Sequence, residues 1–237
     1  MSTSGTYQMA DQVVYEDNHI IIINKLSSQI VQGDKTGDVP LSELIKSFLK
    51  VRDHKPGNVF CGVIHRIDRP VSGLVIFAKT SKALSRFNEM LREKTLQKKY
   101  LAVVKNKPPK VKDKLIHYLS KNEKANMAKA HLKPTANALR AEFDYELLAS
   151  SDNYHLLKID LHTGRHHQIR CQLAAIGCPI KGDLKYGFDR TNKGGFIHLH
   201  SYELNFVHPI KQEQMQIRCM PLSDDSIWQY FIKHMPE

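Results

Sequence analysis

The stretch CGVIHRIDRPVSGLVIFAK, residues 61–79, places a short charged loop between two apolar runs. The second run, 74–77, predicts a buried strand. Asp68 lies in the loop between Arg66 and Arg69, which would favour its ionised form. An ionised carboxylate on a loop that rigid elements hold is a candidate nucleophile. The alternative, which these residues alone favour, is a structural Asp that caps the turn and pairs with an arginine.

A second group of polar residues occupies 162–187, HTGRHHQIRCQLAAIGCPIKGDLKYG. The pattern predicts a helix that begins near 163 and ends at Gly177. Its first turns would carry Arg165, His166, His167, Gln168 and Arg170. A cation such as Arg165 opposes the helix dipole there, so it needs a negative partner, either a phosphate or a carboxylate such as Asp68. A solvated cation is the alternative, and turn geometry alone would explain the glycines at 182 and 187.

The rest of the chain predicts an α+β protein with a mixed, largely antiparallel sheet and flanking helices. Strands are expected at 13–15, 20–24, 100–104, 139–148, 154–161 and 196–206. Helices are expected over 41–49, from Thr80 or Ser81 onward, and near 225–233. Strands outnumber helices and several follow one another directly, which is typical of this class. Residues 1–11 are expected to form a disordered tail and 12–237 a single domain.

The charge of the chain favours a polyanionic partner. Its 237 residues carry a formal net charge of +11, and the pI is near 9.4. An ordinary basic protein is the alternative. Between 92 and 133 thirteen Lys or Arg face three Asp or Glu, so this stretch is a candidate contact surface. The four cysteines form no C-x-x-C pair and no apolar run could cross a membrane, which indicates a cytoplasmic protein with reduced thiols.

Thirteen histidines raise the question of a metal site. His162 and His166 are four residues apart, and His198 and His200 are two apart on an expected strand. The first pair lacks the glutamate of an H-E-x-x-H motif, and no third ligand is evident for either pair. No metal is expected.

Both motif-bearing segments resemble the RluA family of pseudouridine synthases. The family's H-R-L-D-x-x-T-S-G-L signature is matched by His65, Arg66, Ile67, Asp68, Ser72, Gly73 and Leu74. Its T-G-R-x-H-Q-I-R motif is matched by Thr163, Gly164, Arg165, His167, Gln168, Ile169 and Arg170. Its G-x-P-I-x-G-D-x-x-Y-G element is matched by Gly177, Pro179, Ile180, Gly182, Asp183, Tyr186 and Gly187. Its L-H-A…F-x-H-P stretch is echoed by Leu199, His200, Phe206, His208 and Pro209, and its tyrosine-bearing strand by Lys99 and Tyr100. Five motifs in the family's order make the resemblance specific.

The resemblance implies an enzyme that flips a uridine out of a structured RNA and isomerises it to pseudouridine. Two lobes would surround a basic active-site cleft. Asp68 would begin the cleavage, by attack on the sugar, attack on the uracil ring or removal of a ribose proton. Arg165 would be its ion-pair partner, and Tyr100 would stack on the base and help to remove the proton from carbon 5. The other expected RNA contacts are Arg66, Arg69, His65, His167, Arg170, Lys99, Lys105, Lys107, Lys110 and Lys112. Leu74 and Ile169 are expected in the wall of the uracil pocket.

The resemblance further implies that no cofactor is needed and that the substrate is transfer RNA, ribosomal RNA or both. It implies a cytoplasmic monomer with no membrane contact and no obligatory protein partner. Two other functions compete with this interpretation: a catalytically silent RNA-binding protein on the same scaffold, and a metal-dependent hydrolase that uses the histidines. Intact Asp68, Tyr100 and Arg165 argue against the first. A DNA-binding module lacks support, because no helix-turn-helix or zinc-finger spacing is present.

Overall fold

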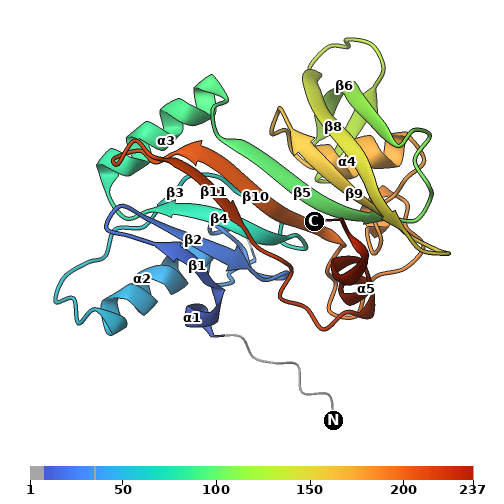
Figure 1. Cartoon of the computed structure of the whole chain (residues 1–237). Helices are drawn as coiled ribbons and strands as arrows, with labels where there is room; N and C mark the ends of the chain where they lie inside the picture. Colours follow the sequence, from blue (N-terminus) through green and yellow to red (C-terminus); the bar gives the residue numbers. More distant parts are fainter. Residues whose placement is uncertain (1–7, 35, 237) are drawn as a thin grey trace.

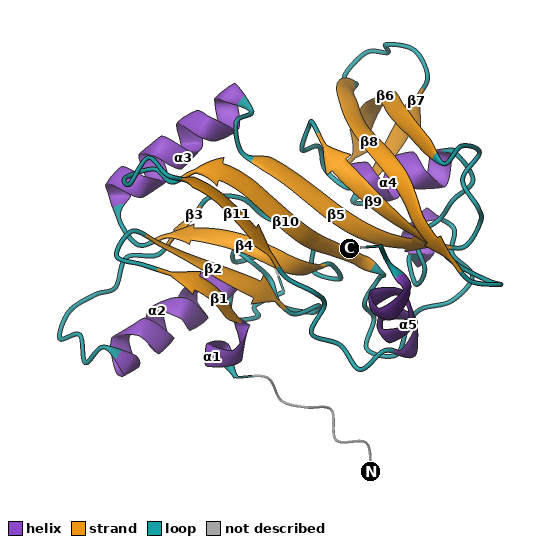
Figure 2. Cartoon of the chain, in the orientation of Figure 1, coloured by secondary structure: helices purple, strands orange, loops and turns teal. Residues whose placement is uncertain are grey.

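One twisted sheet runs through the computed structural model, which describes residues 8–34 and 36–236 (Figures 1 and 2). Its strands are β1 (Val13–Glu16), β2 (Ile20–Lys25), β3 (Gly62–Val63), β4 (Ser72–Ala78), β5 (Gln97–Val104), β6 (Lys112–Asn122), β7 (Met127–His131), β8 (Leu139–Ser150), β9 (His155–Leu161), β10 (Leu199–Val207) and β11 (Gln214–Arg218). Their order is β1-β2-β4-β10-β5-β9-β8-β6-β7, with β3 beside β4 and β11 beside β10. The pair β4–β10 is parallel and the other pairs are antiparallel, so the predicted mixed, largely antiparallel sheet is confirmed.

Helices flank this sheet at both of its ends (Figure 2). They are α1 (Met9–Gln12), α2 (Leu41–Arg52), α3 (Ser81–Glu93), α4 (Gln168–Ala175) and α5 (Ser226–His234), with a short 3-10 turn, η1 (Leu184–Tyr186). The hydroxyl oxygen of Thr80 accepts a hydrogen bond from the amide of Ala83 at 3.2 Å and begins α3, as the sequence predicted. Asp225 begins α5 in the same way, through the amides of Ile227 and Trp228.

The end of the sheet that holds β2 and β4 is buried on both faces, which explains the unbroken apolar run at 20–23. Ile20 and Ile22 pack on the face that α3 covers, with Phe87. Ile21 and Ile23 pack on the opposite face, which α2 covers. Each fully buried aliphatic side chain of this kind contributes about 1.5–3 kcal/mol, so this layered end is a rigid base for the loop that leads into β4.

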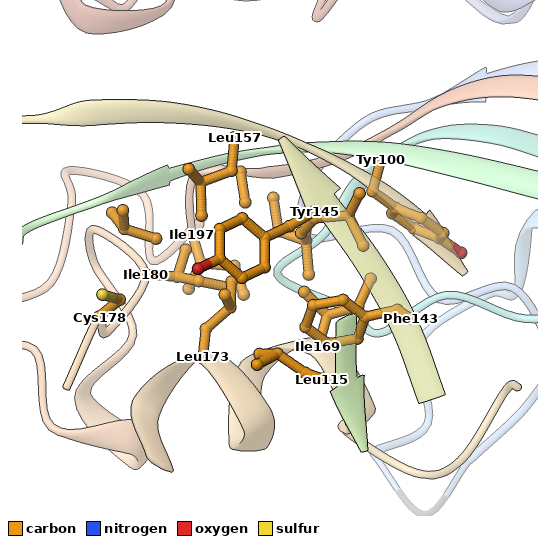
Figure 3. Packing of buried hydrophobic residues seen from close by; sticks show 14 of the residues in the cluster. Tyr100, Leu115, Phe143, Tyr145, Leu157, Ile169, Leu173, Cys178, Ile180 and Ile197 are labelled. Carbon is orange, nitrogen blue, oxygen red and sulfur yellow. The ribbon is translucent and has the colours of Figure 1, made fainter. Parts of the chain in front are cut away.

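A second core lies where α4 packs on β5, β8 and β9 (Figure 3). Tyr100 and Phe143 from the strands meet Ile169 and Leu173 from the helix. On the opposite face of β5, α5 packs Trp228 against Leu101 and Val103 of that strand. The first core therefore fixes the chain before β4, the second fixes the start of α4, and both border the same region of the molecule.

A close approach of β10 to β4 explains the glycine at 73. Gly73 has φ +112°, and a Cβ atom there would overlap the backbone of Ser201. Only glycine allows this approach, which joins the two ends of the sheet at the parallel pair.

Three expectations need correction. No strand was expected between residues 105 and 138, where the structure has the hairpin β6–β7. The helix expected from 163 begins at Gln168 instead. Of the tail expected over 1–11, residues 1–7 lie outside the described part of the chain, while α1 includes residues 9–11.

Candidate active site

A cavity of about 940 Å³ opens between the loop that precedes β4, the start of β5 and the loop that precedes α4. The tip of the β6–β7 hairpin and η1 complete its rim through Lys121, Asn126 and Lys185. Asp68 and Tyr100 both line it. The two cores thus bring the two motif-bearing segments of the sequence together at this cavity.

Asp68 is paired with Arg170, from the first turn of α4. Nη1 of Arg170 donates to Oδ2 of Asp68 at 2.9 Å. The same guanidinium donates to Asp183 through Nε at 2.6 Å and Nη2 at 2.8 Å. Burial opposes the charge of Arg170, but Asp183 and Asp68 outweigh it and raise its pKa. The two bonds to the buried Asp183 fix the plane of the guanidinium, so that an N–H of Nη1 is directed at Asp68, whose side chain is 29% exposed.

Lys25 holds the Asp68 loop from beneath. Its ammonium group is fully buried and donates to the carbonyl oxygens of Leu26 at 2.9 Å, Gln29 at 2.8 Å and Arg69 at 3.3 Å. Burial lowers its pKa to about 7, while the nearby Asp68 favours its charge. The three acceptors use all three protons of the charged form, so this site binds an ammonium ion and fixes the backbone next to Asp68.

The loop before α4 is folded around the side chain of Gln168. Oε1 of Gln168 accepts from the hydroxyl of Thr163 at 2.8 Å and from the amide of Arg165 at 3.0 Å. His167 adopts a left-handed conformation, with φ 50°. This turn delays the helix by several residues, so Arg165 points out of the core and Arg170 points into it.

Tyr100 and Lys98 extend from the same side of β5 into the cavity. Tyr100 is 6% exposed, and burial raises its pKa to about 12, so the phenol is protonated at neutral pH. Burial lowers the pKa of Lys98. No acid lies within ion-pair distance of Lys98 among the residues at 8–34 and 36–236, so its charge faces the cavity.

Comparison with known proteins identifies this arrangement. The profile of the family described as RNA pseudouridylate synthase matches residues 19–175. The chain belongs to the RNA pseudouridylate synthase family. It is therefore an RNA pseudouridine synthase, an isomerase that converts uridine in RNA to pseudouridine, and the resemblance found in the sequence is confirmed.

Individual relatives support the same assignment. The chain is 32% identical over 229 residues to the ribosomal large subunit pseudouridine synthase C of Escherichia coli O157:H7, which covers 91% of this chain and 68% of that one. It is 30% identical to the enzyme of the same name from Buchnera aphidicola subsp. Schizaphis graminum, with 92% and 69% covered. The structure of human RNA pseudouridylate synthase domain containing 4 superposes with a TM-score of 0.80 at 19% identity, covering 97% of this chain and 96% of that one. That superposition supports the synthase fold.

The ion pair expected between Asp68 and Arg165 is wrong. Arg165 is exposed at the rim of the cavity, and its Nε donates to the carbonyl oxygen of Arg140 at 3.2 Å. The partner of Asp68 is Arg170, which the sequence had suggested only as an RNA contact. The reason is the left-handed turn at His167, which shifts the start of the helix.

The residues around Asp68 divide into exposed and structural ones. Arg66 is exposed at the cavity and has no acidic partner in the described chain. Arg69 also lines the cavity but pairs with Asp38 at 2.6 Å. His65 is buried, its Nε2 accepts from the amide of Ile76 at 3.2 Å, and burial lowers its pKa to about 3. His65 therefore supports β4 as a neutral ring.

The other predicted contacts are distributed unevenly. Ile169 lines the cavity, but Leu74 is fully buried in the core beneath α3, outside the pocket wall. Lys99 points away from the cavity and pairs with Glu203 at 2.8 Å. The remaining expected lysines, Lys105, Lys107, Lys110 and Lys112, lie outside the cavity lining. Three of these four are paired: Lys105 with Asp189, Lys110 with Asp113, and Lys112 with Glu146.

Three of the four histidines considered as metal ligands have other partners. Nε2 of His162 contacts Asp144 at 2.8 Å, and Nε2 of His198 contacts Asp225 at 2.8 Å. His200 contacts the hydroxyl of Ser72 and the carbonyl oxygen of Cys219. Within the described residues no group of three His, Cys, Asp or Glu is arranged to hold a metal ion. In the same part of the chain, no helix has the length and apolar character needed to span a bilayer.

Sequence reasoning missed Lys98, Lys25, Lys121 and Lys185. A signal was present for the first, because residues two apart on a strand share a face and Lys98 lies two before Tyr100. Lys25 had a weaker signal, as a cation at the end of an apolar strand. Lys121 and Lys185 reach the cavity only through the tertiary fold.

Proposed function

We propose that Asp68 begins the cleavage of the glycosidic bond of a uridine that is flipped into the cavity. The observation that carries this proposal is the partly exposed carboxylate of Asp68 next to a guanidinium that a second, buried carboxylate holds in place. A preoriented carboxylate of this kind loses little freedom on reaching the reactive geometry.

The reaction is an isomerisation, so its atoms balance within the nucleotide. The bond between N1 and C1′ breaks, the uracil rotates, and the bond between C5 and C1′ forms. C5 loses its proton and N1 ends with one. Asp68 could attack C1′, attack the uracil ring or take a ribose proton, and each route requires the carboxylate to face the same bound nucleotide.

Apolar side chains beside Asp68 suit a flipped base. Tyr100 offers a protonated, buried ring for stacking. Ile169, Leu161, Val71 and Leu199 line the same cavity. Because the pKa of Tyr100 is about 12, the proton on C5 would pass to its hydroxyl only after the phenol has given up its own proton.

Cations without acidic partners suit the phosphates on either side of the flipped nucleotide. Arg66, Lys98, Arg165 and Lys185 line the cavity and have no acid within ion-pair distance in the described chain. Phosphate contacts of this kind dominate non-specific affinity and weaken steeply with salt. Arg69 would need to exchange its carboxylate partners for a phosphate.

The substrate that we propose is a structured RNA, either ribosomal or transfer RNA. The names of the relatives make large-subunit ribosomal RNA the first candidate. The enzyme would act in the cytoplasm as a monomer, with no obligatory protein partner and no cofactor, because no step is a redox or hydrolytic one.

The decisive experiment maps pseudouridines at nucleotide resolution in total RNA from cells that lack this protein. The RNA is first incubated with purified wild-type protein or with Asp68→Asn. New sites made by the wild type alone would support the activity, the role of Asp68 and the substrate together. Sites made equally by both proteins would remove Asp68 from the mechanism. No new site with either protein, although both are folded and bind RNA, would favour the silent RNA-binding alternative.

A further inference from the structure

Tyr186 links the β6–β7 hairpin to the site of Asp68. Its buried hydroxyl oxygen lies 2.8 Å from the amide nitrogen of Ala128 in β7. The same oxygen lies 2.9 Å from Nδ1 of His167. The guanidinium carbon of Arg170 lies over its ring, 5.1 Å from the centroid. One side chain thus touches both residues that flank the carboxylate of Asp68.

The protons of this cluster can be assigned from the donors. A backbone amide can only donate, so the oxygen of Tyr186 accepts from Ala128. The tyrosine has one proton left to donate, and Nδ1 of His167 is the acceptor within reach. Nδ1 of His167 therefore carries no proton, and the proton of the neutral ring is on Nε2.

The opposite side of the ring leads to the same assignment. Nε2 of His167 lies 3.5 Å from Oδ2 of Asp68. The other tautomer would point a bare nitrogen lone pair at this carboxylate and would leave the buried phenol proton without an acceptor, and both changes cost free energy. Burial lowers the pKa of His167 to about 3, so the ring is neutral at physiological pH.

We propose that Tyr186 is a positioning residue that fixes His167 in its Nε2–H tautomer, so that a neutral N–H dipole faces Asp68 beside the Arg170 guanidinium. The inference rests on the proposed role of Asp68. The charge of Arg170 is shared with Asp183, so the dipole of His167 is the second fixed group that orients the carboxylate. A neutral donor does this without adding a further charge that would weaken the nucleophile.

The first test needs no RNA, so it is independent of the proposed function. Two-bond proton–nitrogen NMR spectra of the free protein, labelled with ¹⁵N-histidine, distinguish the two tautomers. The signals of His167 are assigned by their absence in His167→Gln. We expect the Nε2–H pattern in the wild type and a mixture of tautomers in Tyr186→Phe, which keeps the ring beneath Arg170. An Nδ1–H pattern in the wild type, or an unchanged pattern in Tyr186→Phe, would overturn the proposal.

The second test is a double-mutant cycle. Glutamine at 167 can present its amide N–H near the position of Nε2 but has no tautomers. The probe is total RNA labelled with tritium at C5 of uridine, from cells that lack the protein, because isomerisation releases that tritium. We expect Tyr186→Phe to slow single-turnover release about tenfold at unchanged RNA affinity. In the His167→Gln background the same substitution should cost less than about twofold.

Each outcome of the cycle has a distinct meaning. Equal losses in both backgrounds would show that Tyr186 acts through another group, such as Arg170, and would overturn the role assigned to His167. A loss of RNA affinity at an unchanged single-turnover rate would do the same. Failure of the wild type to release tritium would refute the proposed function, while the NMR spectra would still decide the tautomer.

Discussion

The cavity around Asp68 and a smaller hollow on the opposite face of β5, β8 and β9 both contain acidic and basic side chains but differ in their balance of charge. Among the described residues, seven Lys or Arg and two Asp line the cavity. The hollow, of about 480 Å³, is lined by Lys99, Lys112, Lys158, Asp113, Asp144, Glu146, Asp160 and Tyr145. Its acids outnumber its lysines.

Pairing separates the two regions further. In the hollow, Lys112 lies 2.8 Å and Lys158 3.3 Å from Glu146. In the cavity, Lys98 and Arg66 have no such acid within the described chain. The net charge of +11 therefore indicates an anionic partner without locating it. We expect that partner to bind at the cavity, because the fold leaves cations without acidic partners there, around an oriented carboxylate.

The largest expected difference between the two regions concerns their acids. Asp68→Asn should abolish pseudouridine formation, because an amide cannot replace a carboxylate nucleophile or base. Asp160→Asn, in the hollow, should leave the rate unchanged. Tritium release from C5-labelled RNA measures both. Equal rates for wild type and Asp68→Asn would contradict the assignment of the cavity as the reaction site. RNA binding by Asp68→Asn is the control for folding.

The second prediction contrasts two arginines on the cavity side. Arg170→Lys should lower the free energy of unfolding by about 3 kcal/mol, because lysine cannot keep both bonds to the buried Asp183. Arg165→Lys should change it by less than about 0.5 kcal/mol, as exposed substitutions do. Urea denaturation measures both. Similar losses in the two variants would contradict the assignment of Arg170 as the buried partner.

Much of the fold was predictable because its elements carry strong local signals. Periodicity revealed the helix at 41–49, and a capping residue revealed the helix start at Thr80. A continuous apolar run revealed the strand at 20–24. The β6–β7 hairpin was missed because its lysines occupy exposed positions and hide the alternation of buried Leu115, His117 and Leu119. A charge-rich strand is hard to distinguish from a loop by composition.

The site was only partly predictable. Asp68 and Tyr100 were expected at one site and line the same cavity, but the arginine partner was misassigned, because one left-handed residue at His167 moved the helix start. Side-chain bonds such as those of Gln168 set that turn, and helical periodicity cannot reveal them. Lys99 was predicted as an RNA contact, but Lys98 is the lysine that faces the cavity. The alternation of side chains along a strand would have indicated Lys98, because it lies two residues before Tyr100.

The third prediction uses these two neighbouring lysines as a matched pair. Lys98→Met should weaken RNA binding and lower the salt slope of the affinity by about 1, as expected for one lost phosphate contact. Lys99→Met should leave the slope unchanged, because Lys99 faces away from the cavity and is paired with Glu203. Binding of total RNA is measured by filter retention over a range of salt concentrations. A larger loss for Lys99→Met would place the RNA on the opposite face of the sheet.

The smallest effect is expected for a change that alters the most charge. Replacing Lys105, Lys107, Lys110 and Lys112 together by Gln removes four positive charges outside the cavity lining. Three of these lysines are already paired with Asp or Glu, and at about 0.15 M salt exposed charges are screened beyond about 8 Å. The salt slope should therefore fall by less than about 1, no more than for Lys98→Met alone. A fall of about 4 would mean that all four lysines contact phosphates. The RNA would then have to extend well beyond the cavity, along the segment between β5 and the start of β6.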